Sequence, residues 1–282
     1  MESQRNALIV IVFSLAIPLL FWLSAAVAGL VILRHGVKDA LSIVMWGSLP
    51  GIVMAVLGDI TPLLTLLSTS FLAVILRATI NLKITAICTV VLGLMFFWIF
   101  PLLMPEAIAA VQKLSEEFLA KTLEKQPELL AEFKPIVHSL MLGSLAMISA
   151  LISFACLMLA RWWQASFYNP GGFSKEFHIL KMPPAYSLVA VLILVISQQA
   201  PELLIGILPI ISLPLIIAGV ALVHGVVGIK QLGGHWLGIF YISALFFGPN
   251  LFTLLIFVAL VDSFIDIRAR LTPVEAPTDD EL

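Results

Sequence analysis

Two carboxylates near the end of the last apolar run are the side chains in this sequence best placed to do chemistry. Asp262 and Asp266 stand four residues apart, so a helix would carry both on one face. Asp266 can pair with Arg270 one turn later, whereas Asp262 lies deeper and has no cation near it in the sequence. A lone carboxylate in a membrane is costly. We therefore predict that Asp262 meets a basic or hydrogen-bonding group from another helix, with Arg77 or Lys83 favoured, and otherwise serves as a proton or cation site.

A second polar group lies between apolar runs rather than inside one. Asp59 stands beside Thr61 and Pro62, and Gln198, Gln199 and Glu202 cluster in another connector. Together they could line an outward-facing pocket for a polar or cationic solute. The favoured interpretation is simpler, namely that these side chains cap helix ends at the membrane surface.

The segment with the most aromatic and turn residues follows the fifth apolar run. It contains Arg161, Trp162, Trp163, Asn169, Pro170, Gly171, Gly172 and Phe173. Trp and Arg are common at membrane interfaces, and Asn-Pro-Gly-Gly is typical of a turn. The same residues could form a rigid loop that docks a partner. Both interpretations stay open.

No constellation typical of catalysis or of a metal site is present. His224 and His235 lack a carboxylate or thiol at ligand spacing, and Lys230 lies in no phosphate-binding motif. The glycines around them predict a flexible loop over residues 224–234. Cys88 and Cys156 sit inside apolar runs and predict packing residues. We therefore expect no enzyme, no cofactor and no metal.

Composition defines the class of protein. Of 282 residues, 61% are hydrophobic and 11% are charged, and the mean hydropathy is +1.12. A soluble domain carries about 25% charged residues, so this chain could not cover its surface in water. The net charge is −2 and no part of the chain forms a basic domain, so we expect no nucleic-acid partner. The lipid bilayer is the expected environment.

The apolar runs have the length of membrane helices, which need about 20 residues. They cover residues 7–33, 40–58, 60–76, 84–104, 136–160, 185–200, 203–223 and 235–261. The first resembles a signal peptide, but it is too long and stays apolar beyond the small-residue site, so we expect it to be retained.

The distribution of Lys and Arg predicts orientation. Eight single spans would place Arg268 and Arg270 outside, against the positive-inside rule. The first and last runs are long and are interrupted, by Pro18 and by Gly248-Pro249-Asn250 respectively. If each is a hairpin of two short helices, all basic residues outside 105–135 lie on the cytoplasmic side. We therefore favour ten segments, with eight spans and a kinked first helix as the alternative.

These patterns predict an all-α fold, a polytopic transmembrane helical bundle of 8–10 segments with both termini cytoplasmic. A single transmembrane domain should cover residues 1–271. It should include an amphipathic helical insert at 105–135 outside the membrane and a cytoplasmic loop at 161–184. Residues 272–282 contain several acids and two prolines and predict a disordered tail.

A family resemblance rests on three motifs. They are Arg161-Trp162-Trp163-Gln164, then Asn169-Pro170-Gly171-Gly172-Phe173, and the ending Asp262-Ser263-Phe264-Ile265-Asp266-Ile267-Arg268. With them the chain resembles the YybS-like family of uncharacterised bacterial membrane proteins. That family has no settled activity, but its helical layout is similar to the substrate-binding S components of vitamin transporters and to the cell-shape protein MreD. The resemblance implies a multi-pass protein of the bacterial inner membrane.

Two functions from different classes follow. The first is a protein resembling S components, which binds an unknown small solute or docks another membrane or cytoplasmic subunit. The alternative is an MreD-like scaffold in envelope or cell-shape assembly, without a solute. Small residues four apart, such as Ala25 and Gly29, or Ala146 and Ala150, allow close helix contact. Such a face contacts the energising subunit in S components, but packing inside the bundle is the favoured interpretation.

Overall fold

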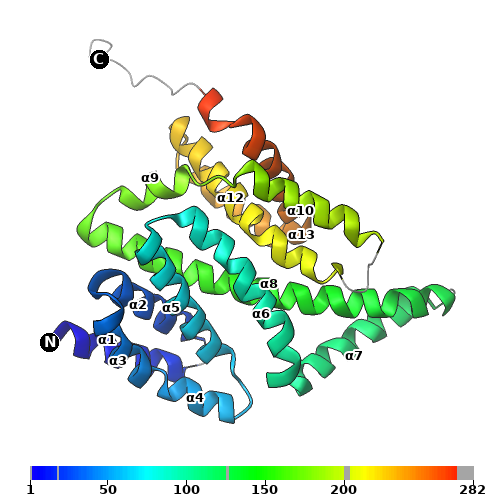
Figure 1. Ribbon diagram of the computed structural model, residues 1–282, viewed down its shortest axis with the longest axis horizontal. Coiled ribbons are helices and arrows are strands. Elements are labelled where there is room, and N and C mark those ends of the chain that lie inside the picture. The colour runs from blue at the N-terminus through cyan, green and yellow to red at the C-terminus, as the bar shows by residue number, and fades with distance from the viewer. Residues whose placement is uncertain (1, 18, 125–126, 200–203, 272–282) are drawn as a thin grey trace. The chain divides into compact units, whose positions relative to one another are not determined.

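The structure, a computed structural model, describes residues 2–17, 19–124, 127–199 and 204–271. Throughout these ranges the regular elements are helices, so the predicted all-α class is confirmed (Figure 1). Pro18, Glu202 and the predicted acidic tail at 272–282 lie outside the described residues.

The helices group into two compact units. Unit 1 consists of Met1–Gly171 with Leu192–Leu213, and unit 2 consists of Gly172–Val191 with Pro214–Leu282. The divisions therefore fall in the 161–184 segment and within two helices. That residues 1–271 form a single transmembrane domain stays a prediction.

Unit 1 begins with pairs of short helices and continues with long ones. Its helices are α1 (Glu2–Ala16), α2 (Phe21–His35), α3 (Val37–Gly47), α4 (Leu49–Val56), α5 (Thr61–Thr79), α6 (Leu82–Leu103), α7 (Pro105–Thr122) and α8 (Pro127–Tyr168). The predicted division of the first run into two short helices is confirmed, and α1 packs against α2. At 15 residues each, they are about 22 Å long, shorter than a hydrocarbon core of about 30 Å.

The second run was expected to be continuous but is two helices. α3 and α4 meet at Ser48 with a bend of 40°. Pro50 lies in the first turn of α4, where its missing N–H costs nothing and its ring cannot continue a preceding helix. Residues 40–58 are therefore a broken segment.

The core of unit 1 is the contact of α2 with α5 and α8 (Figure 1). Small side chains make the contact, because Ala25, Ala28, Ala146 and Ala150 are all fully buried. A Cβ added at Gly29 would lie 3.2 Å from the Cβ of Ala160. The favoured interpretation of the small-residue spacing, packing inside the bundle, is confirmed. Close backbones give membrane helices the van der Waals contact that lipid cannot supply by hydrophobic exclusion.

The 105–135 insert is helical, but its second half is not an independent helix. α7 packs on the first part of α8, which starts at Pro127 and runs unbroken through Pro135 into the apolar run. Lys134 and Glu116 form an ion pair of 3.1 Å between them. The apolar stripe divides, since Ile108 is buried whereas Leu114 and Phe118 are exposed.

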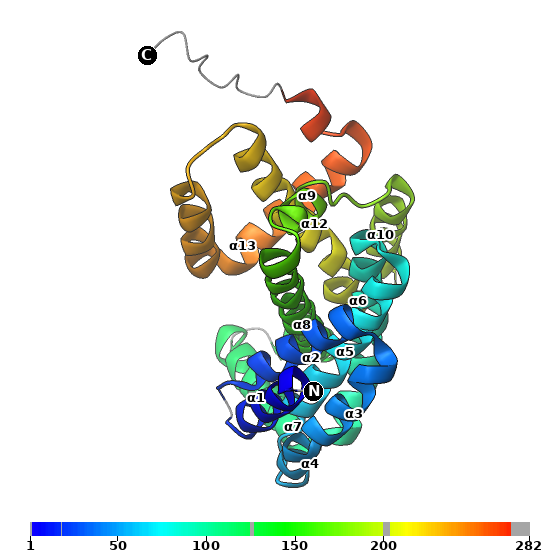
Figure 2. The same ribbon diagram turned by 90° about the vertical axis from the view of Figure 1, so that its left-hand side faces the viewer.

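Unit 2 contains α9 (Gly172–His178), the first half of α10 (Pro184–Ser197), most of α12 (Ile207–Ile229), α13 (His235–Ile265) and the 3-10 turn η1 (Arg268–Arg270). The predicted break of the last run is confirmed, because Gly248 has φ 25° and ψ −103° inside α13. Figure 2 shows the two arms of α13 running in different directions.

Length and apolarity make several helices suitable for crossing a membrane. Within the described residues there are five, namely α5, α6, Phe133–Tyr168 of α8, α12 and α13, with α3 and α4 as a sixth if the bent pair is one span. α10 and the first two helices are apolar but shorter. The chain is thus a multi-pass membrane protein.

The close contact at Gly29 predicts intolerance of larger side chains. Gly29→Leu should lower the thermal unfolding midpoint in detergent, at a cost of about 2 kcal/mol, because the new side chain must displace Ala160 and Thr69. Gly238→Leu is the matched control, since nothing lies within 4 Å of a Cβ built there. Equal midpoints for the two variants would contradict the packing account.

Candidate functional site

The strongest polar site of the described chain lies where α13 ends. The helix closes at Asp266, whose left-handed conformation, φ 55°, turns the chain back into η1. This reversal returns Arg268 to Asp262, which is 2% exposed. The Arg268 Nη2 donates to Asp262 Oδ2 at 2.7 Å, and the Ile267 N–H donates to Oδ1 at 2.8 Å. Both carboxylate oxygens are therefore occupied.

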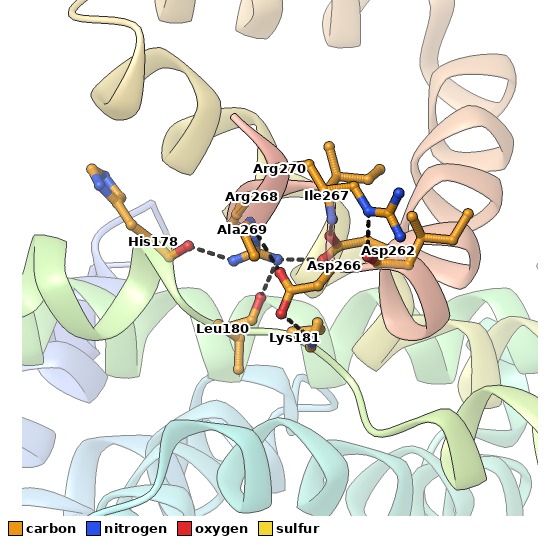
Figure 3. A network of polar contacts seen from close by, with 10 residues as sticks. His178, Leu180, Lys181, Asp262, Asp266, Ile267, Arg268, Ala269 and Arg270 are labelled. Carbon is orange, nitrogen blue, oxygen red and sulfur yellow. Dashed lines mark hydrogen bonds and ion pairs between the residues drawn. The ribbon is translucent and has the colours of Figure 1, made fainter. Parts of the chain in front are cut away.

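The Arg268 guanidinium also holds a second segment of unit 2. Its Nη1 donates to the carbonyl of His178, the last residue of α9, and Nη2 donates to the carbonyl of Leu180 at 2.8 Å. Figure 3 shows the guanidinium between these carbonyls and the Asp262 carboxylate. Carbonyls at a helix C-terminus lack intrahelical partners and attract cations, so the contact satisfies both sides. We call Asp262, Arg268 and the carbonyls of His178 and Leu180 the arginine clasp.

Two glycines of α12 make room for the clasp. A Cβ at Gly225 would lie 2.9 Å from the His178 carbonyl oxygen and 3.2 Å from Cδ of Arg268. At Gly228 it would lie 2.9 Å from Cε1 of His178. The prediction of a flexible loop over 224–234 is wrong for this part, because α12 continues to Ile229. The glycines serve close approach on a helix.

A second ion pair reinforces the clasp nearer the surface. Lys181 Nζ lies 2.6 Å from Asp266 Oδ2, and the Ala269 N–H donates to Oδ1. The bond from Lys181 holds the pKa of the Asp266 carboxyl below its usual range. The expected pairing of Asp266 with Arg270 is therefore wrong, and Arg270 Nε donates instead to the Ile265 carbonyl.

Aromatic and imidazole rings cover the α9 side of the clasp. The rings of Phe177 and His224 meet edge to face at 5.4 Å, and His178 lies 6.4 Å from His224. His224 Nε2 lies 2.8 Å from the Tyr241 hydroxyl oxygen, which links α12 to the first arm of α13. Burial, and secondarily the positive charge of Arg268, lower the pKa of His178.

The geometry makes the site a structural clasp more than a reactive centre. Asp262 has a partner, but it is Arg268, and the proposed partners Arg77 and Lys83 were wrong. Arg77 belongs to unit 1 and donates to the carbonyls of Ile32 and Leu33. Each oxygen of Asp262 accepts one bond from the protein, so pairing is the role that this geometry shows. Among the described residues no group of three or more His, Cys, Asp and Glu could hold a metal ion.

The aromatic segment that begins at Arg161 is only partly a loop. Arg161, Trp162 and Trp163 lie on the last turns of α8, and Phe173 and Gly172 open α9. Trp163 packs against the buried group of Ala25, Ala26 and Cys156, while Trp162 is 52% exposed. The turn itself is Asn169, Pro170 and Gly171, all exposed. Gly171 has φ 81°, which favours glycine, as the Asn-Pro-Gly-Gly pattern indicates.

The other predicted polar residues are not brought together. Asp59 Oδ1 accepts from the N–H of Thr61, the first residue of α5, at 3.0 Å, in a turn that precedes the Ile60 N-cap. Gln198 and Gln199 are exposed in the turn after α10 and make no hydrogen bond with Asp59. Glu202 lies outside the described residues. Asp59 thus satisfies one backbone N–H at the start of α5.

Searches of protein-family models, curated proteins and solved structures give no match to this chain.

Removing one charge of the arginine clasp should lower the stability of the fold more than removing both charges. Arg268→Gln leaves a buried carboxylate without its cation, which typically costs about 3–5 kcal/mol, so the unfolding midpoint in detergent should fall sharply. The double variant Asp262→Asn with Arg268→Gln should recover a large part of that loss. If the double variant were as unstable as the sum of its single changes, the ion pair would not be the stabilising interaction.

The lowered pKa of His178 predicts a pH dependence. A histidine that is harder to protonate in the folded state stabilises the fold fully above its unfolded pKa, about 6.5, and loses that contribution as pH falls. The unfolding midpoint should therefore drop between pH 7.5 and pH 5. Asp266 titrates below this window, because Lys181 lowers its pKa.

His178→Gln should flatten this dependence, whereas His235→Gln, an exposed histidine of the same unit, should leave it unchanged. A drop of the same size in both variants would show that other groups cause it.

Proposed function

We propose that this chain is a multi-pass inner-membrane protein of the YybS-like type that docks another protein subunit through its cytoplasmic 161–184 segment. It is not an enzyme. The helices of unit 2 form a fixed support for residues 172–184 of that segment. Both termini and the basic connectors lie on the cytoplasmic side, and the 105–135 insert lies on the other.

The arginine clasp is the observation that carries the docking proposal. A connector between two membrane helices needs no fixed conformation, and fixing each residue costs about 1–2 kcal/mol of backbone entropy. Here a guanidinium holds the backbone at His178 and Leu180, and Leu180 and Met182 are buried at 3% and 0% exposure. Ile179 between them is 76% exposed. A rigid segment that presents an apolar side chain is pre-organised for binding, because ordering is complete before the partner arrives.

Charge distribution supports the orientation. Arg34, Lys38, Arg77 and Lys83 all lie at or next to the end of unit 1 where Arg77 and Gln164 bond the last carbonyls of α2. Short basic connectors are retained in the cytoplasm. Two short helices at the start of the chain and a broken α13 are consistent with both termini returning to that side.

Packing of unit 1 favours docking over the S-component reading. The small-residue face of α2, which would have contacted an energising subunit, is buried against α5 and α8. An MreD-like scaffold needs only a stable bundle and an exposed docking segment. We therefore place the scaffold class ahead of solute binding for this protein.

A photo-crosslinking amino acid at Ile179 tests the proposal in cells. It should give one discrete protein adduct, because Ile179 faces outward from a fixed backbone. The adduct should be lost in the double variant Asp262→Asn with Arg268→Gln while the protein still accumulates in the membrane. The matched control is the same amino acid at Leu245, an 82% exposed apolar residue of α13 that should meet lipid.

Absence of any adduct at Ile179, or an adduct unaffected by the double variant, would refute the docking role.

Orientation is checked in a variant with Cys88 and Cys156 replaced by Ser. A cysteine at Lys121 should react with an impermeant reagent in intact cells, and one at Ser174 only after permeabilisation. Labelling of Ser174 in intact cells would reverse the topology.

A further inference from the structure

The basic end of unit 1 has the features of a site for an anionic lipid headgroup. The C-terminal ends of three helices meet there, because Arg77 of α5 and Gln164 of α8 both donate to the Leu33 carbonyl of α2. Residues 34–39 and 77–83 carry Arg34, Lys38, Arg77 and Lys83 against one acid, Asp39. This is a local excess of three positive charges at a membrane surface.

Arg77 is only half engaged by the protein. Its Nη1 bonds the carbonyls of Ile32 and Leu33, but Nη2 and Nε donate to no residue in the described ranges. The side chain is exposed, and its Nη2 lies 3.2 Å from a Cβ position at Gly36, so the guanidinium is held against the α2–α3 turn. A guanidinium with two fixed free donors matches the geometry of a phosphate.

An unusual residue lies between the cations. Ile80 ends α5 in the left-handed conformation, φ 49°, which a β-branched residue adopts only against a steric penalty. Its side chain is 88% exposed. In a bilayer, an outward isoleucine beside Arg77 and Lys83 would contact the acyl chains of the lipid whose headgroup those cations hold.

We propose that Arg34, Lys38, Arg77, Lys83 and Ile80 bind an anionic phospholipid of the cytoplasmic leaflet, the phosphate at Arg77 and the acyl chains at Ile80. The Arg34 guanidinium carbon lies 4.6 Å from the centroid of the Tyr168 ring, and this contact holds the cation at the edge of the proposed site. The inference uses the membrane orientation proposed above but not the docking role.

The test is binding of short-chain phosphatidylglycerol to the purified full-length protein in detergent. Lys38→Gln with Lys83→Gln should weaken the apparent Kd about twenty-five-fold, at about five-fold for each lysine. Lys113→Gln with Lys121→Gln on α7 is the control for total charge and should leave the Kd unchanged. Short-chain phosphatidylcholine should bind at least ten-fold more weakly.

Two further binding measurements identify the ligand. Ile80→Ser should weaken the lipid but not glycerophosphoglycerol, which has the headgroup without acyl chains. Inorganic phosphate that competes as well as the lipid would assign the site to free phosphate and refute the lipid proposal. Equal Kd values for the two lysine pairs would refute the site itself, whatever the crosslinking at Ile179 gives.

Discussion

One guanidinium, that of Arg268, holds the end of α9 against the end of α13 in unit 2. It neutralises a carboxylate that is 2% exposed, and it bonds two carbonyls on a segment almost ninety residues earlier in the chain. Neither partner could be left alone, because an unpaired buried charge and an unsatisfied buried carbonyl are both costly. The end of α13, the end of α9 and the approach to α10 are therefore fixed together. The rigidity of the 172–184 segment, on which the proposed docking depends, follows from this constraint.

Unit 1 is held by a different kind of interaction. There the helices α2, α5 and α8 approach through glycine, alanine and serine, and Thr69 of α5 donates to the Ser153 carbonyl of α8 at 3.1 Å. Polar groups gather instead at the helix ends, where Arg77 and Gln164 satisfy the last carbonyls of α2. Small-residue packing inside and cationic side chains at the ends let an apolar chain keep its backbone satisfied. The same end carries an excess of positive charge, which the proposed anionic lipid would neutralise.

The features that could be predicted from the sequence are helix breaks, which membrane thickness requires, and a partner for a buried charge, which the cost of desolvation requires. Helices too long for one crossing were expected to break, and both the first run and the Gly248 region do so. The break at Ser48 was missed because residues 40–58 fit a single span and Pro50 is acceptable within one. Asp262 was expected to need a cation, but Arg268 is six residues away, a spacing that a continuous helix does not bring together. Only the reversal at Asp266 makes it possible, and a left-handed aspartate has no reliable sequence signal.

The other parts of the arginine clasp are backbone carbonyls and close contacts between helices, which could not be predicted from residue types. The carbonyls of His178 and Leu180 carry no residue-type signature, since any residue supplies one. Gly225 and Gly228 were interpreted as flexible because glycine is common in loops, although here they let α9 approach α12. Their spacing of three on an apolar helix was the available signal.

Amide hydrogen exchange over residues 172–184 tests the central claim most directly. With the arginine clasp in place, the amides of this segment should exchange slowly in the purified wild-type protein. They should exchange rapidly in the double variant Asp262→Asn with Arg268→Gln, while the amides of α5 and α8 stay protected. Rapid exchange of the segment in the wild-type protein would contradict the account, because a flexible connector could not be the fixed surface that the clasp is proposed to hold.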